Sequence, residues 1–565
     1  MTLTRPLITG RRFMASSGHW LATMAAYEIL AAGGNAVDAG CAAGMVLGVV
    51  QPDIVNIAGV APIMIRLAET GQILTIAGLG HWPASLPEGH FVTAHGGTIP
   101  PGVQRCVVPA APDAWITALK LHGTMTFAEV ASAAIRHARD GFFVYPMLAE
   151  SLAAHEAEYR RWPSTKAVFY PEDRMPAEGE LFVQSDLAAT LDYMANAETQ
   201  ARGDRLAGLE AARAAFYAGD IARMITGFVA EQGGFLSMDD MRGFRSRIEP
   251  AVTMPWRGMQ LSVCGPWTQG PVLLHALRLL EGYDLAAMGH NSPEMIHTIV
   301  EALKWAFADR EAHYGDPAQV EVPLDAILSD ANVRAQRARI DPGRALSDMP
   351  DSLLPAAGGH PPVPQGDAPQ GDPDTSYVCV VDRAGNTFSA TPSDGSWSVP
   401  MVPGTGLVPS TRGSQSRPYP GHPSSARAGK RPRLTPNPAI LVDGDAVTPF
   451  GTPGGDVQSQ AMLQFLLNRH VFGMNPQEAL DAPRFATYSF PSSFAPFTAY
   501  PGLVKLEAGI APETAQGLAQ RGHRIGDWPR HTWLAGGVCA ITARPSAGDY
   551  QGAADPRRPS YAAGS

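Results

Sequence analysis

The sequence is poor in cysteine and contains no long apolar run. Its five cysteines lie far apart and form no Cys-x-x-Cys pair, so neither a zinc site nor a disulfide framework is expected. No window approaches the roughly 18 consecutive apolar residues that a membrane-spanning helix needs. The first residues also lack the apolar core and cleavage site of a signal peptide. These absences predict a reducing compartment, with the cytoplasm as the default location and no membrane partner.

Positive charge is also scarce. The 43 Lys and Arg residues against 53 Asp and Glu residues give a formal net charge of -10, which repels phosphate backbones and excludes a general nucleic-acid binder. A cluster of cations at residues 417–433 has almost no interleaved aromatic residues, so we interpret it as steering a small anion or covering the site. With 565 residues, 45% of them hydrophobic, the chain is long enough for one large core or two domains.

The common catalytic motifs are missing as well. The sequence has no phosphate-binding Gly-x-x-x-x-Gly-Lys-Ser/Thr loop, no His-Glu-x-x-His, no Gly-x-Ser-x-Gly and no dinucleotide fingerprint after a strand. Its 16 histidines show no metal-like spacing. These absences remove the usual phosphate, zinc and serine-hydrolase interpretations, and we expect neither a metal nor a cofactor.

Hydrophobic periodicity and turn residues predict a mixed chain of helices and strands. Helices are expected at residues 20–32, 39–50, 127–140, 185–196, 208–232 with breaks, 270–280, 293–314 and about 456–471. Asn35 and Asp38 form a pair typical of a capping box before the second of these helices. A strand is expected at residues 259–263, and hairpins are expected at residues 377–391 and 439–450.

Residues 355–374 break this pattern. Pro, Gly, Gln and Asp crowd together there with almost no apolar residue to offset the entropy of ordering, so we interpret the segment as a mobile surface linker. The segment ends at Asp374, and Thr375 opens the next strand. The junction of a polar linker with a buried strand is a candidate cleavage site.

Thr375 would gain a base of its own if the Asp374–Thr375 bond were cut. A new α-amino group has an unperturbed pKa of about 7.7 to 8.0, which suits it to accept the hydroxyl proton. The hydroxyl would then attack an amide carbonyl and form an acyl-enzyme that water or an amine releases. The alternative is that Thr375 is an ordinary β-branched strand residue, which the local pattern alone favours.

Several motifs together resemble the γ-glutamyltransferase family of N-terminal-nucleophile hydrolases, over nearly the whole chain. They are GGNAVDA at residues 33–39, ARDGF at 138–142, YGDP at 314–317, the segment 375–386 and DPRR at 555–558. The resemblance implies an α/β (α+β) fold, a four-layer αββα sandwich, in a precursor that cleaves itself before a threonine nucleophile. It implies a large subunit of residues 1–374 and a small subunit of residues 375–565.

The resemblance also assigns catalytic positions. Thr375 falls on the family's nucleophile, and Ser393 falls where the family has a second hydroxyl that helps to activate it. Gly454 and Gly455 fall on the family's oxyanion-hole glycines. Two glycines before a helix also let backbone N–H groups approach a reacting oxygen, although an ordinary strand-to-helix turn is the alternative. Thr391, on the same strand face as Ser393, is a further candidate or a plain strand residue.

The sequence departs from the family where the family holds the amino-acid head of its donor. Residues 410–415 carry no carboxylate for the donor's α-amino group, and Thr435 stands in place of a serine of the family. No arginine matches the family's carboxylate-binding residue, for which His81 is a candidate substitute. Arg412 is expected to favour a substrate carboxylate, with a solvated loop cation as the alternative.

These departures predict an amide hydrolase for γ-glutamyl or related carboxylate-bearing acyl amides, with hydrolysis favoured over transfer. Glutaryl amides and oxamate-like compounds fit an acyl group that lacks the α-amine. The expected partners are a small-molecule amide substrate and the two subunits of one precursor. Two alternatives stay open: a non-glutamyl amidase, and an uncleaved homologue that binds without catalysis.

Overall fold

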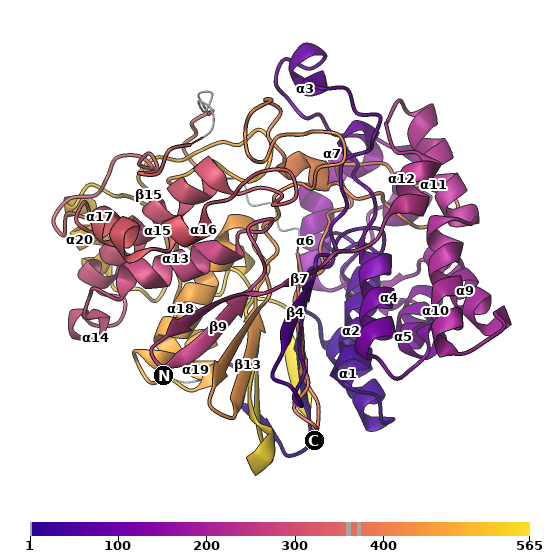
Figure 1. Ribbon diagram of the computed structural model, residues 1–565, viewed down its shortest axis with the longest axis horizontal. Coiled ribbons are helices and arrows are strands. Elements are labelled where there is room, and N and C mark those ends of the chain that lie inside the picture. Colours follow the sequence, from indigo (N-terminus) through magenta and orange to yellow (C-terminus); the bar gives the residue numbers. More distant parts are fainter. Residues whose placement is uncertain (1–2, 357–362, 370–374) are drawn as a thin grey trace.

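The computed structural model describes residues 3–356, 363–369 and 375–565. Two seven-stranded sheets lie face to face, and helices cover the outer side of each sheet (Figure 1). The chain therefore has four layers in the order helix, sheet, sheet, helix, and the predicted αββα sandwich is confirmed. None of the helices in the described ranges has both the length and the apolar character needed to cross a membrane.

The first sheet takes most of its strands from the second half of the chain. Its order is β1 (Ile8–Gly10), β18 (Asp549–Ala554), β17 (Cys539–Arg544), β13 (Ala446–Gly451), β12 (Ala439–Asp443), β9 (Met259–Val263) and β8 (Val252–Trp256). Neighbouring strands in this sheet are antiparallel. One apolar cluster joins its outer face to α13 (Gly270–Leu280), α15 (Pro293–His313) and α18 (Gln458–His470).

The second sheet is also antiparallel and mixes the two halves of the chain. Its order is β19 (Tyr561–Gly564), β2 (Met14–Ser17), β10 (Val378–Val381), β11 (Thr387–Ala390), β3 (Ile63–Arg66), β4 (Ile73–Ile76) and β7 (Ile248–Pro250). Its outer layer contains α1 (Trp20–Ala31), α2 (Ala36–Val50), α4 (Ala111–His122), α5 (Phe127–Asp140), α9 (Ser185–Gln200) and α10 (Arg205–Tyr217).

The sequence of strand β10 is apolar throughout, because the strand is buried on both faces of the sheet. All four of its residues, VCVV, are buried. Val378 and Val380 belong to the cluster shared with α2, whereas Cys379 and Val381 belong to the cluster between the two sheets. A strand that is covered on both faces has no solvent side, and therefore no polar alternation.

The strands of residues 375–565 interleave with those of residues 1–374. The β10–β11 hairpin lies between β2 and β3, and β12 pairs with β9 in the other sheet. The two segments are therefore not separate folding domains. A cut at the Asp374–Thr375 junction would leave two chains that share both sheets.

The predicted helices and hairpins are confirmed, with differences in where several of them begin or end. Asn35 and Asp38 form a complete capping box, and α2 begins at Ala36. The break predicted within residues 208–232 is confirmed: the chain turns at Gly219, between α10 and α11 (Asp220–Glu231). The last predicted helix begins at Gln458, because a short 3₁₀ turn at Gly455–Val457 precedes it.

The close approach of α2 to β11 yields a stability prediction. A Cβ atom at Gly40 would lie 2.1 Å from the buried ring of Phe388, whereas one at Gly227 in α11 would meet nothing within 4 Å. We expect Gly40→Ala to lower the free energy of unfolding by about 1–3 kcal/mol through overpacking. Gly227→Ala is the matched control and should raise it by up to about 1 kcal/mol. Urea unfolding followed by circular dichroism measures both, and equal shifts would contradict the packing argument.

Candidate active site

Thr375 and Ser393 are brought together by the sheet that contains β10 and β11. Thr375 forms an antiparallel bridge with Ser393, and Ser393 forms a second one with Val60. The backbone N–H of Ser393 donates to the Val60 carbonyl at 3.0 Å, which fixes the chain just beyond β11. Both hydroxyl residues are fully buried, and Thr375 Oγ1 lies 2.8 Å from Ser393 Oγ.

Arg412 adds a cation to this hydroxyl pair. It begins a 3₁₀ turn at Arg412–Gln415 and is only 1% exposed. Its Nη2 donates a hydrogen bond to Ser393 Oγ, and its Nε lies 3.4 Å from Asp394 Oδ1. The alternative that Arg412 is a solvated loop cation is wrong, because the surrounding loops cover the guanidinium and supply its partners.

Asp394 is a residue of this cluster that the sequence analysis missed. Its carboxylate accepts hydrogen bonds from the Ser410 hydroxyl at 2.6 Å, the Thr411 N–H at 3.1 Å and the Thr411 hydroxyl. Burial raises the pKa of the Asp394 carboxyl, and Arg412 and these donors oppose the rise. Its φ of 129° lies in the left-handed region. An aspartate directly after a candidate hydroxyl was the signal available in the sequence.

Gly454 and Gly455 form the turn between β13 and α18. Their φ angles are 116° and 54°, in the region that favours glycine. No group within the described ranges accepts a hydrogen bond from either amide N–H. The Gly455 carbonyl accepts from Gln269 Nε2 at 2.8 Å, which holds the turn in place. Two amides at the start of a helical segment are suited to stabilise a negative oxygen.

A buried ion pair fixes the same turn from the other side. Asp456 pairs with Arg310 of α15. It also accepts two hydrogen bonds from Ser493, one from the backbone N–H at 2.7 Å and one from the hydroxyl at 2.7 Å. The glycine turn is therefore held between the outer helix α15 and the loop that contains Ser493.

Thr435 and Thr391, two further predicted site residues, have different surroundings. Thr435 is buried, accepts from Gln415 Nε2 at 3.0 Å, and is joined to the glycine turn because Gln269 also donates to its carbonyl at 3.1 Å. Thr391 is buried beyond β11, and its hydroxyl has no hydrogen-bond partner among the described residues. Asp374, the residue before the proposed cut, lies outside the described residues.

His81 lies apart from the hydroxyl cluster. Its Nδ1 is 2.9 Å from the Trp82 carbonyl oxygen, and its ring packs against Phe244 with the centroids 6.0 Å apart. These contacts join His81 to its neighbour in sequence and to the segment after α12 (Met238–Gly243). They include neither Thr375 nor the glycine turn.

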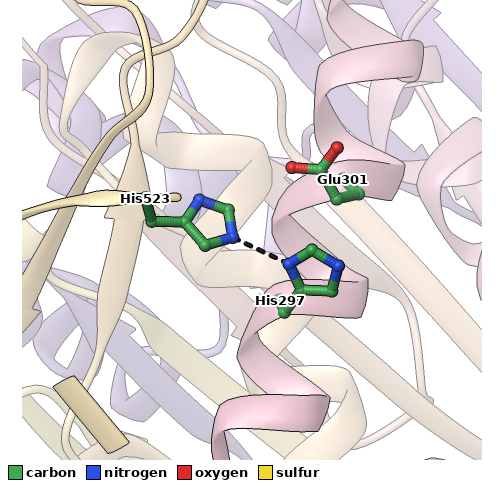
Figure 2. Close-up of side chains that lie close together, drawn as sticks. All are labelled: His297, Glu301 and His523. Carbon is green, nitrogen blue, oxygen red and sulfur yellow. Dashed lines mark hydrogen bonds between the residues drawn. The ribbon is translucent and has the colours of Figure 1, made fainter. Parts of the chain in front are cut away.

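One group within the described ranges has the geometry to hold a metal ion. Ligand atoms of His297, Glu301 and His523 lie within 4.8 Å of one another (Figure 2). His297 Nδ1 is 2.8 Å from His523 Nε2, and burial lowers the pKa of both rings, to about 3 for His523. Lys304 donates to Glu301 at 2.7 Å. The sequence could not show this group, since the two histidines lie far apart in the chain.

This histidine group is remote from the glycine turn. His297 and Arg310 are both on α15, and thirteen residues of helix separate them by about 20 Å. Arg310 is the residue of that helix that pairs with Asp456 beside the glycines. The hydrogen bonds of the group tie α15 to the loop before β16 (Arg524–Trp528), which is a structural role.

Sequence comparisons identify the family to which the chain is similar. The sequence profile described as Gamma-glutamyltranspeptidase matches residues 22–565. An Acylase ACY 1 proenzyme of Pseudomonas sp. (strain V22) is 32% identical over 560 residues, which cover 97% of this chain and 92% of that protein. Other relatives are named glutathione hydrolase proenzyme in Escherichia coli (strain K12) and oxamate amidohydrolase proenzyme in Klebsiella pneumoniae.

Solved structures show the same fold along the full chain. The protein named LmbA2991HD aligns with a TM-score of 0.93 and 34% identity, covering 100% of both chains. A cephalosporin acylase from Bacillus halodurans aligns with a TM-score of 0.86 and 28% identity, covering 100% of this chain and 98% of the other. The fold is that of the N-terminal-nucleophile hydrolases, and the chain is an enzyme of the amide hydrolase and acyltransferase class. By its profile match and its relatives, the chain belongs to the gamma-glutamyltranspeptidase family.

Proposed function

We propose that this chain is the precursor of an N-terminal-threonine amide hydrolase that cleaves itself between Asp374 and Thr375. The observation that carries the proposal is the buried pair of hydroxyls on Thr375 and Ser393, 2.8 Å apart, with the Arg412 guanidinium bonded to the second. An ordinary strand threonine does not need such a cluster. The proenzyme names of the relatives support self-processing.

The hydrogen bonds indicate how Thr375 is activated. A guanidinium has only donors, so Ser393 Oγ accepts from Arg412 and keeps its own hydrogen for an acceptor. Thr375 Oγ1, at 2.8 Å, is placed to accept that hydrogen. Once Thr375 is the first residue of its chain, its α-amino group is the base that takes its hydroxyl proton.

The amide reaction then follows from these groups. Thr375 Oγ1 attacks the substrate carbonyl, and the amides of Gly454 and Gly455 stabilise the oxygen that becomes negative. The α-ammonium gives its proton to the leaving amine, and the acyl group stays on Thr375 Oγ1 as an ester. Water, deprotonated by the same α-amine, hydrolyses the ester and restores the threonine.

The two products of self-cleavage stay together in this proposal. Residues 375–565 supply β10 and β11 to a sheet whose neighbouring strands β2 and β3 come from residues 1–374. The large and small subunits therefore form one folded unit. A cytoplasmic location fits the five cysteines, all of which are buried and unpaired.

The acyl group that the site favours carries a carboxylate and no α-amine. Residues 410–415 offer no carboxylate to an ammonium group, and the nearby carboxylate of Asp394 is already bound by Ser410, Thr411 and Arg412. A substrate ammonium would meet the Arg412 cation without a free counter-charge. A non-glutamyl acyl amide therefore fits better than a γ-glutamyl donor, and a relative named as an acylase proenzyme is compatible with this choice.

The first prediction concerns processing. Thr375→Ala removes the attacking hydroxyl, so the purified protein should stay a single chain of 59.9 kDa and lack activity. Thr375→Ser keeps a hydroxyl and should still divide into fragments that end and begin at the Asp374–Thr375 junction. Denaturing gels and mass spectrometry measure this, and an intact, active wild-type chain would refute the mechanism.

The second prediction concerns Arg412. Arg412→Gln removes the charged hydrogen bond to Ser393, worth about 1.5–3 kcal/mol, so kcat of the processed enzyme should fall about 10- to 100-fold. KM should change less than kcat, because the Arg412 guanidinium is bonded to Ser393 and paired with Asp394, and acts on the substrate carboxylate only through its charge. Arg427→Gln, at an exposed position in the same region, is the control. A large rise in KM with kcat unchanged would instead assign Arg412 to substrate binding.

The third prediction concerns the acyl group. The processed enzyme should hydrolyse a glutaryl anilide with a kcat/KM at least about tenfold above that for the γ-glutamyl anilide, which corresponds to roughly 1.4 kcal/mol. The two substrates differ in the α-amine alone, so leaving-group chemistry cancels. A preference for the γ-glutamyl compound would overturn the proposed acyl specificity while leaving the nucleophile in place.

A further inference from the structure

An aromatic cavity of about 390 Å³ lies beside the glycine turn. Gly454 and Gly455 form part of its wall. The aromatic residues that line it are Tyr488, Phe490, Phe494, Tyr500, Trp528 and Trp533. Its volume lies in the range of about 300–1,000 Å³ that is usual for small-molecule sites.

Phe494 connects the cavity with the hydroxyl cluster. A Cβ atom at Gly455 would lie 3.3 Å from Phe494 Cε2, so the ring stands against the glycine turn. The Arg412 guanidinium lies 5.9 Å from the centroid of the same ring. One aromatic side chain therefore lies beside Gly455, lines the cavity and faces the cation that binds Ser393.

The cavity wall is built before any substrate arrives. Phe490 is stacked on Phe307 of α15 with a centroid separation of 3.7 Å, and Tyr488 meets Trp528 edge to face at 6.2 Å. Asp456 and Arg558 are the two charged residues of the lining, and Asp456 is neutralised by Arg310. A preformed wall of ring faces favours a flat apolar group.

A described part of the segment before the cleavage site lies at this cavity. Gly366, Ala368 and Pro369 contribute to its lining. The Gly366 N–H donates to the Ala499 carbonyl at 3.0 Å, and the Ala499 N–H donates to the Pro364 carbonyl at 2.8 Å. In the uncut chain, the precursor's own backbone thus covers part of a site that we assign to substrate.

We propose that this cavity binds the leaving-amine half of the substrate, and that this half carries an aromatic or fused ring. This inference rests on the proposed function, in which the acyl half carries a carboxylate, and it places that half on the Arg412 side of Phe494. The scissile carbonyl then lies at the glycine turn, with the ring of the amine among the aromatic side chains. Neither a free amino acid nor a small alkylamine would fill this space.

The test compares two amides of one acyl group on the processed enzyme. Glutaryl 2-naphthylamide carries a fused ring on the amine, and glutaryl methylamide carries none. Trp533→Ala should lower kcat/KM for the naphthylamide about tenfold, as expected for a lost aromatic contact of roughly 1.4 kcal/mol. The same variant should change kcat/KM for the methylamide less than about twofold. Taking the ratio of variant to wild type for each substrate cancels their different intrinsic reactivities.

A matched control and a binding measurement complete the test. Trp20→Ala removes a tryptophan on α1 that is 49% exposed and is not part of the cavity lining. This variant should leave kcat/KM for both amides unchanged. Binding of 2-naphthylamine, followed by its fluorescence, should weaken about tenfold in Trp533→Ala. Tyr500→Leu removes another ring of the lining, and should also weaken binding of 2-naphthylamine if Trp533→Ala fails to fold; unchanged binding in Tyr500→Leu would then overturn the ring site.

The outcomes separate this inference from the proposed function. Wild-type hydrolysis of both amides, with equal losses in Trp533→Ala, overturns the ring site and leaves the nucleophile standing. A ring preference on the acyl half, seen as faster hydrolysis of phenylacetyl methylamide than of glutaryl naphthylamide, also overturns the inference. A wild-type protein that stays uncut and hydrolyses nothing refutes the proposed function, and failure to bind 2-naphthylamine independently refutes the ring site.

Discussion

The buried charge of Arg412 is the constraint on which the rest of the site depends. A guanidinium that is 1% exposed needs partners, and removing a partner from a buried ion pair costs several kcal/mol. Asp394 supplies the opposite charge, and Ser410 and Thr411 hold Asp394 in turn. Because these bonds fix the guanidinium, the donor that faces Ser393 has a fixed direction too.

The central position of the β10–β11 hairpin explains how residues from both sides of the Asp374–Thr375 junction build one rigid site. Thr375 stands just before β10, which has a strand hydrogen-bonded on each side and packed layers on both faces. Thr375, the proposed nucleophile, and Ser393 are thus positioned by sheet hydrogen bonds that span residues from both sides of the junction. The proposed self-cleavage at this point would break one peptide bond and leave in place the sheet hydrogen bonds that position the two hydroxyls.

The sequence predicted what local patterns determine and missed what tertiary packing determines. The capping box of α2, both hairpins and the extent of α13 follow from residues close in sequence, so their prediction succeeded. Asp394 was missed because its role arises from a contact between two loops. The burial of Arg412 contradicted the general rule that charges stay exposed, since its counter-charge could not be seen in the local sequence.

The glycine turn and the aromatic cavity are held by the same contacts. Ser493 binds Asp456 through both its backbone and its hydroxyl, so the loop that contains Phe494 is anchored to the residue that follows Gly455. A substrate ring that displaces this loop would strain the Asp456 contacts and shift the glycine amides. A ring that fits the existing wall leaves them in place, so affinity for the amine and alignment of the carbonyl rise together. In the proposed mechanism, a leaving amine that fits this cavity therefore also keeps the scissile carbonyl aligned with the glycine amides, which raises kcat as well as affinity.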